Sequence, residues 1–246
     1  MRITTYFLLL LLLTGCSGYE VRDEQVYWTY WNEGTGNGER ELNADHKTFK
    51  ILEHNRYAKD KFRVFYQGSE VKGADAESFK SVWEFYGVDK SHAFYGEKLI
   101  LNSIGSSFEV LDGNFSRDGK DYFFNEKPLN VCDYESFLIH DFNGEYGNWL
   151  SYDDECAYFQ KNRIPLEDRG SFKILTGGYT KDKINVYYAW KIVEGADPES
   201  FEMIGNTFGG RDKHGCFNGF DRVECLWGTH LTNALTLAAL AGDKNT

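Results

Sequence analysis

One repeated pattern of residues constrains the fold of this chain more than any other feature. An aromatic residue recurs in the same sequence context at Tyr66, Tyr95, Phe124, Phe159 and Tyr188. The steps between these positions are 29, 29, 35 and 29 residues, and Asn218 takes the position 30 residues later. A register that is kept over five steps predicts a repeat architecture, in which the recurring residues form a framework.

Two further positions of the repeat are framework candidates. An aspartate, six residues before the aromatic position, is expected to form a turn, because its side chain can hydrogen-bond its own backbone there. These residues are Asp60, Asp89, Asp118, Asp153, Asp182 and Asp212. A Ser-Phe dipeptide follows thirteen residues after the aromatic position, and its phenylalanines are Phe79, Phe108, Phe137, Phe172 and Phe201. Core and cross-strand packing is the expected role of the recurring aromatic residues.

The side chains within one repeat alternate as they do in a strand. Ile184, Val186 and Tyr188 alternate with polar or aromatic neighbours, which is the period of two of a β-strand. A short turn and a second strand would complete a hairpin, so that each repeat holds two or three strands. We expect an all-β array of about seven hairpin repeats of roughly 29 residues, followed by a short C-terminal helix. A propeller-like ring and an open, capped meander or solenoid both fit the pattern.

The first of these repeats is divergent. Its hairpin, near Tyr30-Trp31, is expected to carry a long loop over Asn32–Arg40. Six additional residues lie between the third and fourth repeats, around Gly144–Trp149. Aromatic residues outside the frame are candidates for ligand contacts, since functional loops often depart from a scaffold. They are Trp28, Trp31, Trp83, Tyr146, Trp149 and Trp190, and we favour Tyr146, Trp149 and Trp31 as possible binding residues.

The N-terminus has the pattern of an export signal. Arg2 precedes the apolar run Phe7–Leu13, which is too short to span a bilayer. Leu13–Cys16 resembles a bacterial lipobox, which implies cleavage before Cys16 and acylation of its sulfur; an ordinary signal peptide is the alternative. Ser17 then implies sorting to the outer membrane in a host with two membranes. We expect a signal peptide at 1–15, a tether at 16–25, the repeat domain at 26–231 and a partly helical tail at 232–246.

Four cysteines follow Cys16, and an even number in an exported chain predicts disulfides. Cys216 and Cys225 lie two residues before and seven after the aromatic position of their repeat. If the aromatic position faces the residue five places further on across the hairpin, these two cysteines are opposite each other. We therefore predict the pair Cys216–Cys225, which leaves Cys132–Cys156. A zinc site is the alternative, but the chain has no Cys-x-x-Cys motif.

The fifth repeat carries a family resemblance. Its string Lys181–Tyr188, KDKINVYY, and the downstream Gly195–Phe201, GADPESF, resemble the DKNYY repeat family of bacterial exported and lipid-anchored proteins. The third and fourth repeats depart from this pattern, since Gly119 and Asp154 replace the second lysine. The family has no known function, so the resemblance implies no catalytic residues.

Charge and motifs limit the classes of function. The net charge of −11 disfavours nucleic acid as a partner, because phosphate backbones are repelled. The chain has no Gly-x-Ser-x-Gly, His-Glu-x-x-His or Walker motif, and we expect no catalytic residue, metal or cofactor. The acidic run Asp153-Asp154-Glu155 is the one place where we would look for an ion.

We therefore expect a non-catalytic interaction module of the bacterial cell envelope. It would be attached to the membrane through its acyl anchor, facing the periplasm or the cell surface, and would bind a protein or another envelope component. An immunity-type lipoprotein that neutralises a toxin is one specific version. The alternative is an envelope enzyme that acts on glycans through paired carboxylates, whose separation in space a sequence does not reveal.

Overall fold

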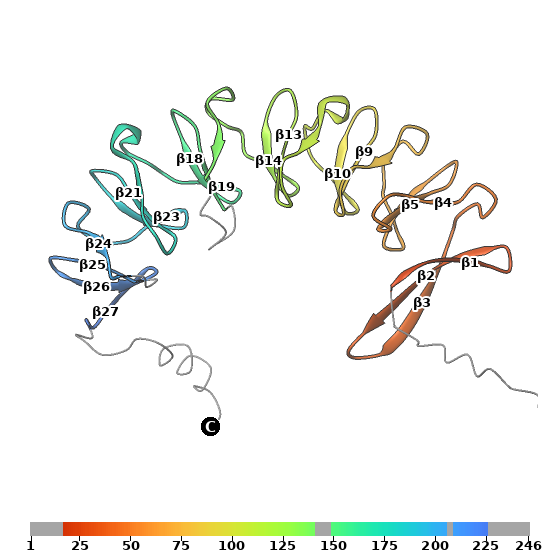
Figure 1. The fold of residues 1–246 in the computed structure, drawn as a ribbon, viewed down its shortest axis with the longest axis horizontal. Coiled ribbons are helices and arrows are strands. Elements are labelled where there is room, and N and C mark those ends of the chain that lie inside the picture. The colour runs from red at the N-terminus through yellow and green to blue at the C-terminus, as the bar shows by residue number, and fades with distance from the viewer. Residues whose placement is uncertain (1–16, 141–148, 206–208, 226–246) are drawn as a thin grey trace, which may run out of the picture. The chain divides into compact units, whose positions relative to one another are not determined.

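A computed structural model describes residues 17–140, 149–205 and 209–225 (Figure 1). The chain divides into two compact units, Met1–Asp154 and Glu155–Thr246, which we describe one at a time. The predicted signal peptide, Cys16, Tyr146 and the predicted C-terminal helix lie outside the described residues. Within the described ranges, no helix has the length and apolar character needed to cross a membrane.

The described residues form an all-β fold of small antiparallel sheets, none of which closes into a barrel (Figure 1). The first unit begins with a three-stranded sheet, β1 (Gly18–Arg22), β2 (Gln25–Asn32) and β3 (Gly36–Leu42). Three four-stranded sheets follow: β4 (Lys50–Ile51), β5 (Tyr57–Lys59), β6 (Val64–Tyr66), β7 (Ser69–Glu70); β8 (Lys80–Ser81), β9 (Tyr86–Val88), β10 (Ala93–Tyr95), β11 (Lys98–Leu99); and β12 (Glu109–Val110), β13 (Phe115–Arg117), β14 (Tyr122–Phe124), β15 (Lys127–Pro128). The paired strands β16 (Leu138–Ile139) and β17 (Leu150–Tyr152) end the unit.

The second unit repeats this plan. It begins with the hairpin β18 (Ala157–Phe159) and β19 (Asn162–Arg163). Two four-stranded sheets follow: β20 (Lys173–Ile174), β21 (Tyr179–Lys181), β22 (Val186–Tyr188), β23 (Lys191–Ile192); and β24 (Glu202–Met203), β25 (Gly209–Asp212), β26 (Gly215–Asn218), β27 (Asp221–Val223). The described helical turns are two 3-10 turns in connectors, one in each unit, η1 (Gly105–Ser107) and η2 (Arg169–Ser171).

Each four-stranded sheet is a meander whose neighbouring strands are consecutive in the chain. Its first strand comes directly after the Ser-Phe or Thr-Phe dipeptide of the preceding repeat, as β8 does after Phe79. A sheet is therefore built from two successive sequence repeats and has four strands, where the sequence predicted two or three. The added strand pairs with one edge of the hairpin, so fewer backbone groups are left unpaired.

The hairpin turns are shorter than predicted, and this shifts the register. Tyr66 pairs with Ser69 around the two-residue turn Gln67-Gly68, in which both residues have positive φ, 45° and 76°. This combination defines a type I′ turn, which suits the twist of antiparallel strands. The aromatic position thus faces the third residue further on, and the predicted five-residue offset is wrong.

The disulfide Cys216–Cys225 is nevertheless present, with its Cα atoms 5.2 Å apart. In the true register Cys216 pairs with Val223, so the disulfide reaches diagonally across the hairpin instead of directly. Cys132 and Cys156 are also disulfide-bonded. The prediction that the cysteines are oxidised is therefore confirmed, although the hairpin does not have the register on which the prediction of the first pair rests.

The N-terminal sheet differs from its predicted form. Strands β2 and β3 pair up to Asn32 and Gly36, so the predicted loop over Asn32–Arg40 is wrong; most of that stretch is strand. Gly34 and Thr35 N–H donate to Asn32 Oδ1 and close the tight turn. Strand β1 lies within the segment expected to be a tether, and it is paired along its whole length with β2.

The core is formed mainly by aromatic rings that pack between successive sheets. Phe79 lies between Tyr57 and Phe94, with ring centroids 5.2 and 5.7 Å away. Phe201 repeats this in the second unit, between Tyr179 and Phe217. Among the recurring aromatic residues, Tyr66 and Phe124 are buried, whereas Tyr95, Phe159 and Tyr188 are half-buried. Of the Ser-Phe rings, Phe79, Phe137 and Phe201 are buried, and Phe108 and Phe172 are half-buried.

Candidate functional site

The recurring aspartates lie at one end of each sheet, which we call the connector end. Here the turn between the second and third strands meets the connector from the preceding sheet. Asp60 Oδ1 accepts hydrogen bonds from the N–H groups of Phe62 and Arg63, at 2.6 and 2.7 Å. Its Oδ2 accepts from Asp45 N–H in the connector, at 2.7 Å. The same arrangement of both oxygens recurs at Asp89, Asp118, Asp182 and Asp212.

These aspartates therefore do more than form the predicted turns. Asp89 is 3% exposed, and its carboxylate is held by backbone N–H groups from two directions. Hydrogen bonds to a carboxylate are stronger than those between neutral groups. The recurring aspartate joins each hairpin to the connector before it, so its carboxylate is occupied in a framework role.

The hydroxyl of the Ser-Phe dipeptide completes this connection. Ser78 Oγ accepts a hydrogen bond from Lys90 N–H at 3.0 Å, and donates one to Asp75 at 2.7 Å. The Lys90 ammonium in turn forms an ion pair with Asp75 at 3.1 Å. The hydrogen bond from Ser78, followed by the one from Lys90, lowers the pKa of Asp75. Equivalent ion pairs are Lys61–Asp45, Lys183–Asp168 and Lys213–Asp197.

The third and fourth repeats lack this ion pair in different ways. Ile104 and Gly119 replace the aspartate and the lysine together, so neither charge is left alone. In the fourth repeat Asp133 is kept, but Asp154 stands where the lysine would be. The acidic run that begins at Asp153 arises from this replacement. Asp153 itself is buried and accepts from Asp133 N–H, as a framework aspartate does.

Tyrosine hydroxyl groups connect successive sheets at the opposite end. Tyr57 Oη donates to the carbonyl oxygens of Phe85 and Gly96, both at 2.9 Å, in the next sheet. Tyr179 Oη donates to Gly219 O at 2.8 Å in the second unit. Burial raises the pKa of Tyr179 to about 12, and it raises that of Tyr57 further. These phenols stay neutral and serve as hydrogen-bond donors between repeats.

Large aromatic side chains outside the frame divide into buried and exposed ones. Trp28 is buried, so it is not available to a ligand. The predicted binding residues Trp31 and Trp149 are 53% and 43% exposed; Trp31 lies near the end of β2, and Trp149 directly precedes β17. Trp83, which is not among the favoured binding residues, is 45% exposed, and its ring lies 6.2 Å from that of His54. Only the spacing of the repeats could have indicated this neighbour.

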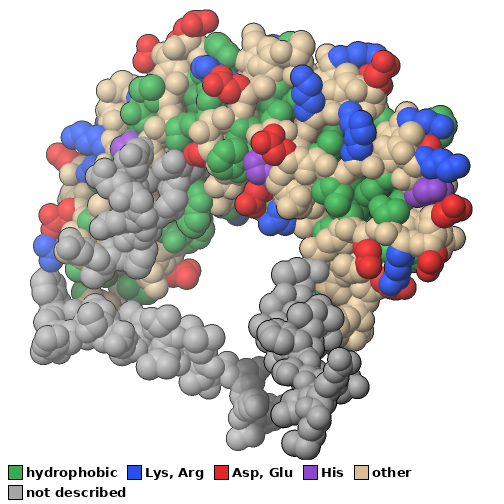
Figure 2. Space-filling view, turned by 45° about the vertical axis from the view of Figure 1, so that its right-hand side comes forward, with side chains coloured by type: hydrophobic (Ala, Val, Ile, Leu, Met, Phe, Trp, Pro, Cys, Tyr) green, Lys and Arg blue, Asp and Glu red, His purple; other side chains and the backbone are tan. Residues whose placement is uncertain are grey.

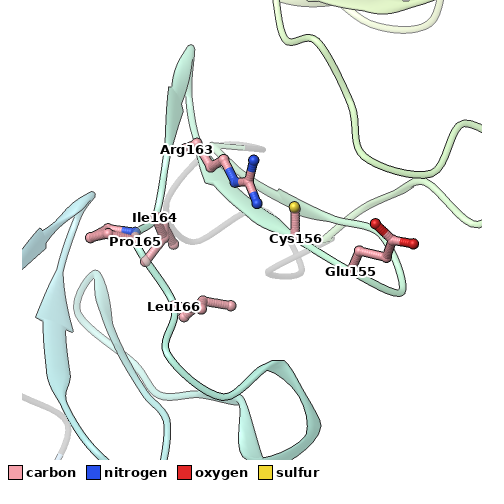
Figure 3. Close-up of a pocket in the computed structure, with 6 residues that line it drawn as sticks. All are labelled: Glu155, Cys156, Arg163, Ile164, Pro165 and Leu166. Atoms are coloured by element: carbon pink, nitrogen blue, oxygen red, sulfur yellow. The ribbon is translucent and has the colours of Figure 1, made fainter.

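A pocket of about 300 Å³ lies in the second unit (Figure 3). Arg163 extends across it toward Cys156, with Glu155 at one side and Pro165 at the other (Figure 3). Glu155 is the one carboxylate among the described residues of its lining, and the sulfur of Cys156 is in a disulfide. The described lining therefore does not show the two facing carboxylates of an ordinary glycosidase.

A wider depression of about 600 Å³ lies at the connector end of the sheet β4–β7 in the first unit. Its lining contains four lysines, although the chain as a whole carries a net charge of −11. On the face shown in Figure 2, acidic and basic side chains are interspersed among hydrophobic ones. The lining residues are Lys47, Thr48, Lys50, Lys59, Asp60, Lys61, Ala76 and Glu77.

Comparison with known proteins agrees with the repeat pattern. No curated protein and no solved structure matches the chain. The model of the DKNYY family matches residues 19–162 and again 106–221. Two overlapping matches are what a tandem repeat produces, and together they cover most of the sequence. The chain therefore belongs to the DKNYY family.

Proposed function

We propose that this protein is a lipid-anchored, non-catalytic binding module of the bacterial cell envelope, held at the outer membrane through an acylated Cys16. One observation carries the proposal: the polar groups of the repeat frame bond to one another, whereas several large aromatic side chains outside the frame are exposed. Asp89 and Ser78 exemplify the first group, and Trp31 and Trp83 the second. Exposed tryptophans are typical of the energetic centres of protein interfaces.

The charge of the chain supports a partner protein with a basic surface. A net charge of −11 attracts positively charged partners and speeds their encounter. The tight, fully paired β2–β3 hairpin carries Trp31 on a rigid element, so little side-chain or loop ordering is required on binding. A rigid aromatic contact in an acidic surface suits recognition better than turnover.

Site-specific photocrosslinking in the native envelope tests this function. A photoreactive phenylalanine at Trp31 or Trp83 should yield the same crosslinked protein, and that protein should have a basic surface. Glu41, which is exposed on β3, provides a control position that should yield less of it. Crosslinks that are equally abundant at all three positions, or none at all, would contradict a specific protein partner.

The anchor needs a separate test. Cys16→Ala should abolish palmitate labelling and release the protein from the membrane fraction. Retention of the unlabelled variant in that fraction would show that the proposed anchor is wrong, while leaving the partner proposal untouched.

A further inference from the structure

The depression beside the sheet β4–β7 has more positive charge than its framework uses. Lys59 Nζ donates to the carbonyl oxygens of Ala76, Glu77 and Phe79, at 2.7, 3.3 and 2.9 Å, so its three protons are taken. Lys61, also in the lining, forms an ion pair at 3.2 Å with Asp45, which is not a lining residue. The ammonium groups of Lys47 and Lys50 have no ion-pair partner among the described residues of the first unit.

The acidic groups of the lining do not balance this charge. The Asp60 carboxylate accepts three backbone N–H groups, at 2.6 to 2.7 Å, and is buried. Glu77 is the other acid in the lining, and it is exposed. Lys50 also pairs directly with Lys59 across the β4–β5 ladder. Like charges in directly opposite positions destabilise a sheet, and a bound anion would relieve their repulsion.

The other repeats show that the fold does not require these lysines. The place of Lys47 in the connector is taken by Glu77, Ser106, Glu135, Gly170 and Glu199. The place of Lys50 is taken by Lys80, Glu109, Leu138, Lys173 and Glu202. Only the connector end of the sheet β4–β7 therefore has a lysine at all four of these repeat positions. The fifth repeat comes nearest, with Lys173, Lys181 and Lys183, but Gly170 stands where Lys47 would be.

We propose that this depression binds a phosphate group, through the ammonium groups of Lys47 and Lys50. Ammonium groups bind phosphate as compact point charges, and each offers three donors. A volume of about 600 Å³ is large enough for the headgroup of an anionic phospholipid as well as for free phosphate. No tryptophan is among the described residues of its lining, and the proposed site does not depend on a protein partner.

The position of the first sheet makes a lipid headgroup a reasonable source. Strand β1 begins at Gly18, two residues after the proposed acyl anchor at Cys16. Two extended residues span only about 7 Å, so an acylated chain would hold its first sheets near the lipid surface. Basic residues near an anionic surface strengthen attachment to it. The assignment of a lipid headgroup as the ligand rests on the proposed anchor at Cys16, whereas the phosphate site itself does not.

Lysine footprinting on the full chain in neutral detergent tests the site. The rate of acylation of each lysine is measured by peptide mass mapping at constant ionic strength. One arm adds inorganic phosphate, and the other adds phosphatidylglycerol to the micelles. At ligand concentrations ten times the dissociation constant, acylation of Lys47 and Lys50 should slow roughly 10-fold. Protection in both arms indicates a site for the phosphate group itself, and protection by the lipid alone indicates a headgroup site.

Two variants separate a built site from general charge attraction. Lys47→Glu introduces the residue that three other connectors carry, so the fold should be unchanged while protection of Lys50 is lost. Gly170→Lys should create protection at Lys173, and the backbone at 170 has room for the substitution, because a Cβ there would lie in ordinary contact with Asp168 Oδ1, at 3.4 Å. Absence of protection in both arms, or equal protection of Lys173 and Lys183 in the unaltered chain, would overturn the proposal.

Discussion

Asp182 offers the sharpest test of the framework, because its carboxylate connects a turn, a connector and a tyrosine. It is 2% exposed. Oδ1 accepts from Ile184 and Asn185 N–H at 2.8 and 2.7 Å, and Oδ2 accepts from Glu167 N–H, Asp168 N–H and Tyr187 Oη at 2.9, 3.1 and 2.8 Å. Asp182→Asn keeps the shape but leaves only one acceptor oxygen for these donors.

The loss in free energy of unfolding follows from the number of N–H donors that lose their acceptor. Either the two turn N–H groups or the two connector N–H groups must face the new amide nitrogen. Tyr187 Oη can turn to Pro165 O, which already lies 3.1 Å away. A buried N–H group without an acceptor costs about 1–3 kcal/mol, and the two affected groups here are part-buried, so the cost of each lies toward the lower end of that range. We therefore expect Asp182→Asn to lower the free energy of unfolding of the second unit by roughly 3 kcal/mol.

The same contacts predict the pH dependence. Burial raises the pKa of Asp182, but the hydrogen bonds from Asn185, Tyr187, Ile184 and Asp168 outweigh it, so the pKa is lowered overall. A lowered pKa means that the charged form stabilises the fold above the ordinary value of about 3.9, and that this contribution is lost as the pH falls through the folded pKa. The stability difference between the protein and Asp182→Asn should therefore shrink below about pH 4.

Urea unfolding followed by circular dichroism measures this difference at pH 7 and at pH 3. Amide hydrogen exchange should show lost protection at Ile184 and Asn185 or at Glu167 and Asp168. Glu167→Gln is the matched control, because its side chain is exposed and a surface change should stay within about 0.5 kcal/mol. A variant as stable as the control at pH 7, or a difference that persists unchanged at pH 3, would refute the proposed connecting role of Asp182.

Three further changes test other parts of the fold. Cys216→Ser should cost roughly 3 kcal/mol in denaturant unfolding, because the disulfide to Cys225 closes a loop of about ten residues; no change in midpoint would contradict this. Gly210→Ala should cost about 1–3 kcal/mol, since its Cβ would overlap Phe201 Cζ, and Phe201→Leu should restore part of the loss. Ala189→Gly should raise the thermal midpoint, with a gain of about 0.5–1 kcal/mol, because Ala189 has φ of 54°; a lower midpoint would show that the turn is not strained.

The repeat frame allowed the all-β class and the recurring turns to be predicted, and the even number of cysteines allowed the disulfides to be predicted. It did not indicate how the turns are connected. Asp182 binds the N–H of Asp168, fourteen residues earlier, and that contact depends on how one sheet is placed against the preceding connector. A periodic sequence shows that two residues recur together, but it does not show which member of the pair contacts the previous repeat.

Alternation also placed the strands two residues too early. Ile184 continues the apolar alternation of Val186 and Tyr188, yet it is 51% exposed and lies in the turn before β22. Phe62 in the first repeat is 64% exposed for the same reason. The carboxylate of the preceding aspartate captures the N–H groups that a strand would use, so the turn prevails over the pattern of side chains. Position 184 is therefore a place where an apolar side chain meets solvent.

The structure distinguishes charged residues that are lost in pairs from a charged residue that is added without a partner, and the proposed phosphate site depends on this difference. Ile104 and Gly119 lose the aspartate and the lysine of one ion pair together, which is what a purely structural contact allows. Lys47 departs from the frame without an ion-pair partner among the described residues of the first unit, in a connector end where three other lysines already lie. An ammonium group without a counter-charge lowers the stability of the fold if no anion binds to it. Loss of both members of an ion pair leaves no charge unpaired and lowers the stability little. For this reason Lys47 indicates a ligand and Gly119 does not. The protection of Lys173 against acylation that we expect from Gly170→Lys tests this inference in a repeat for which we propose no such site.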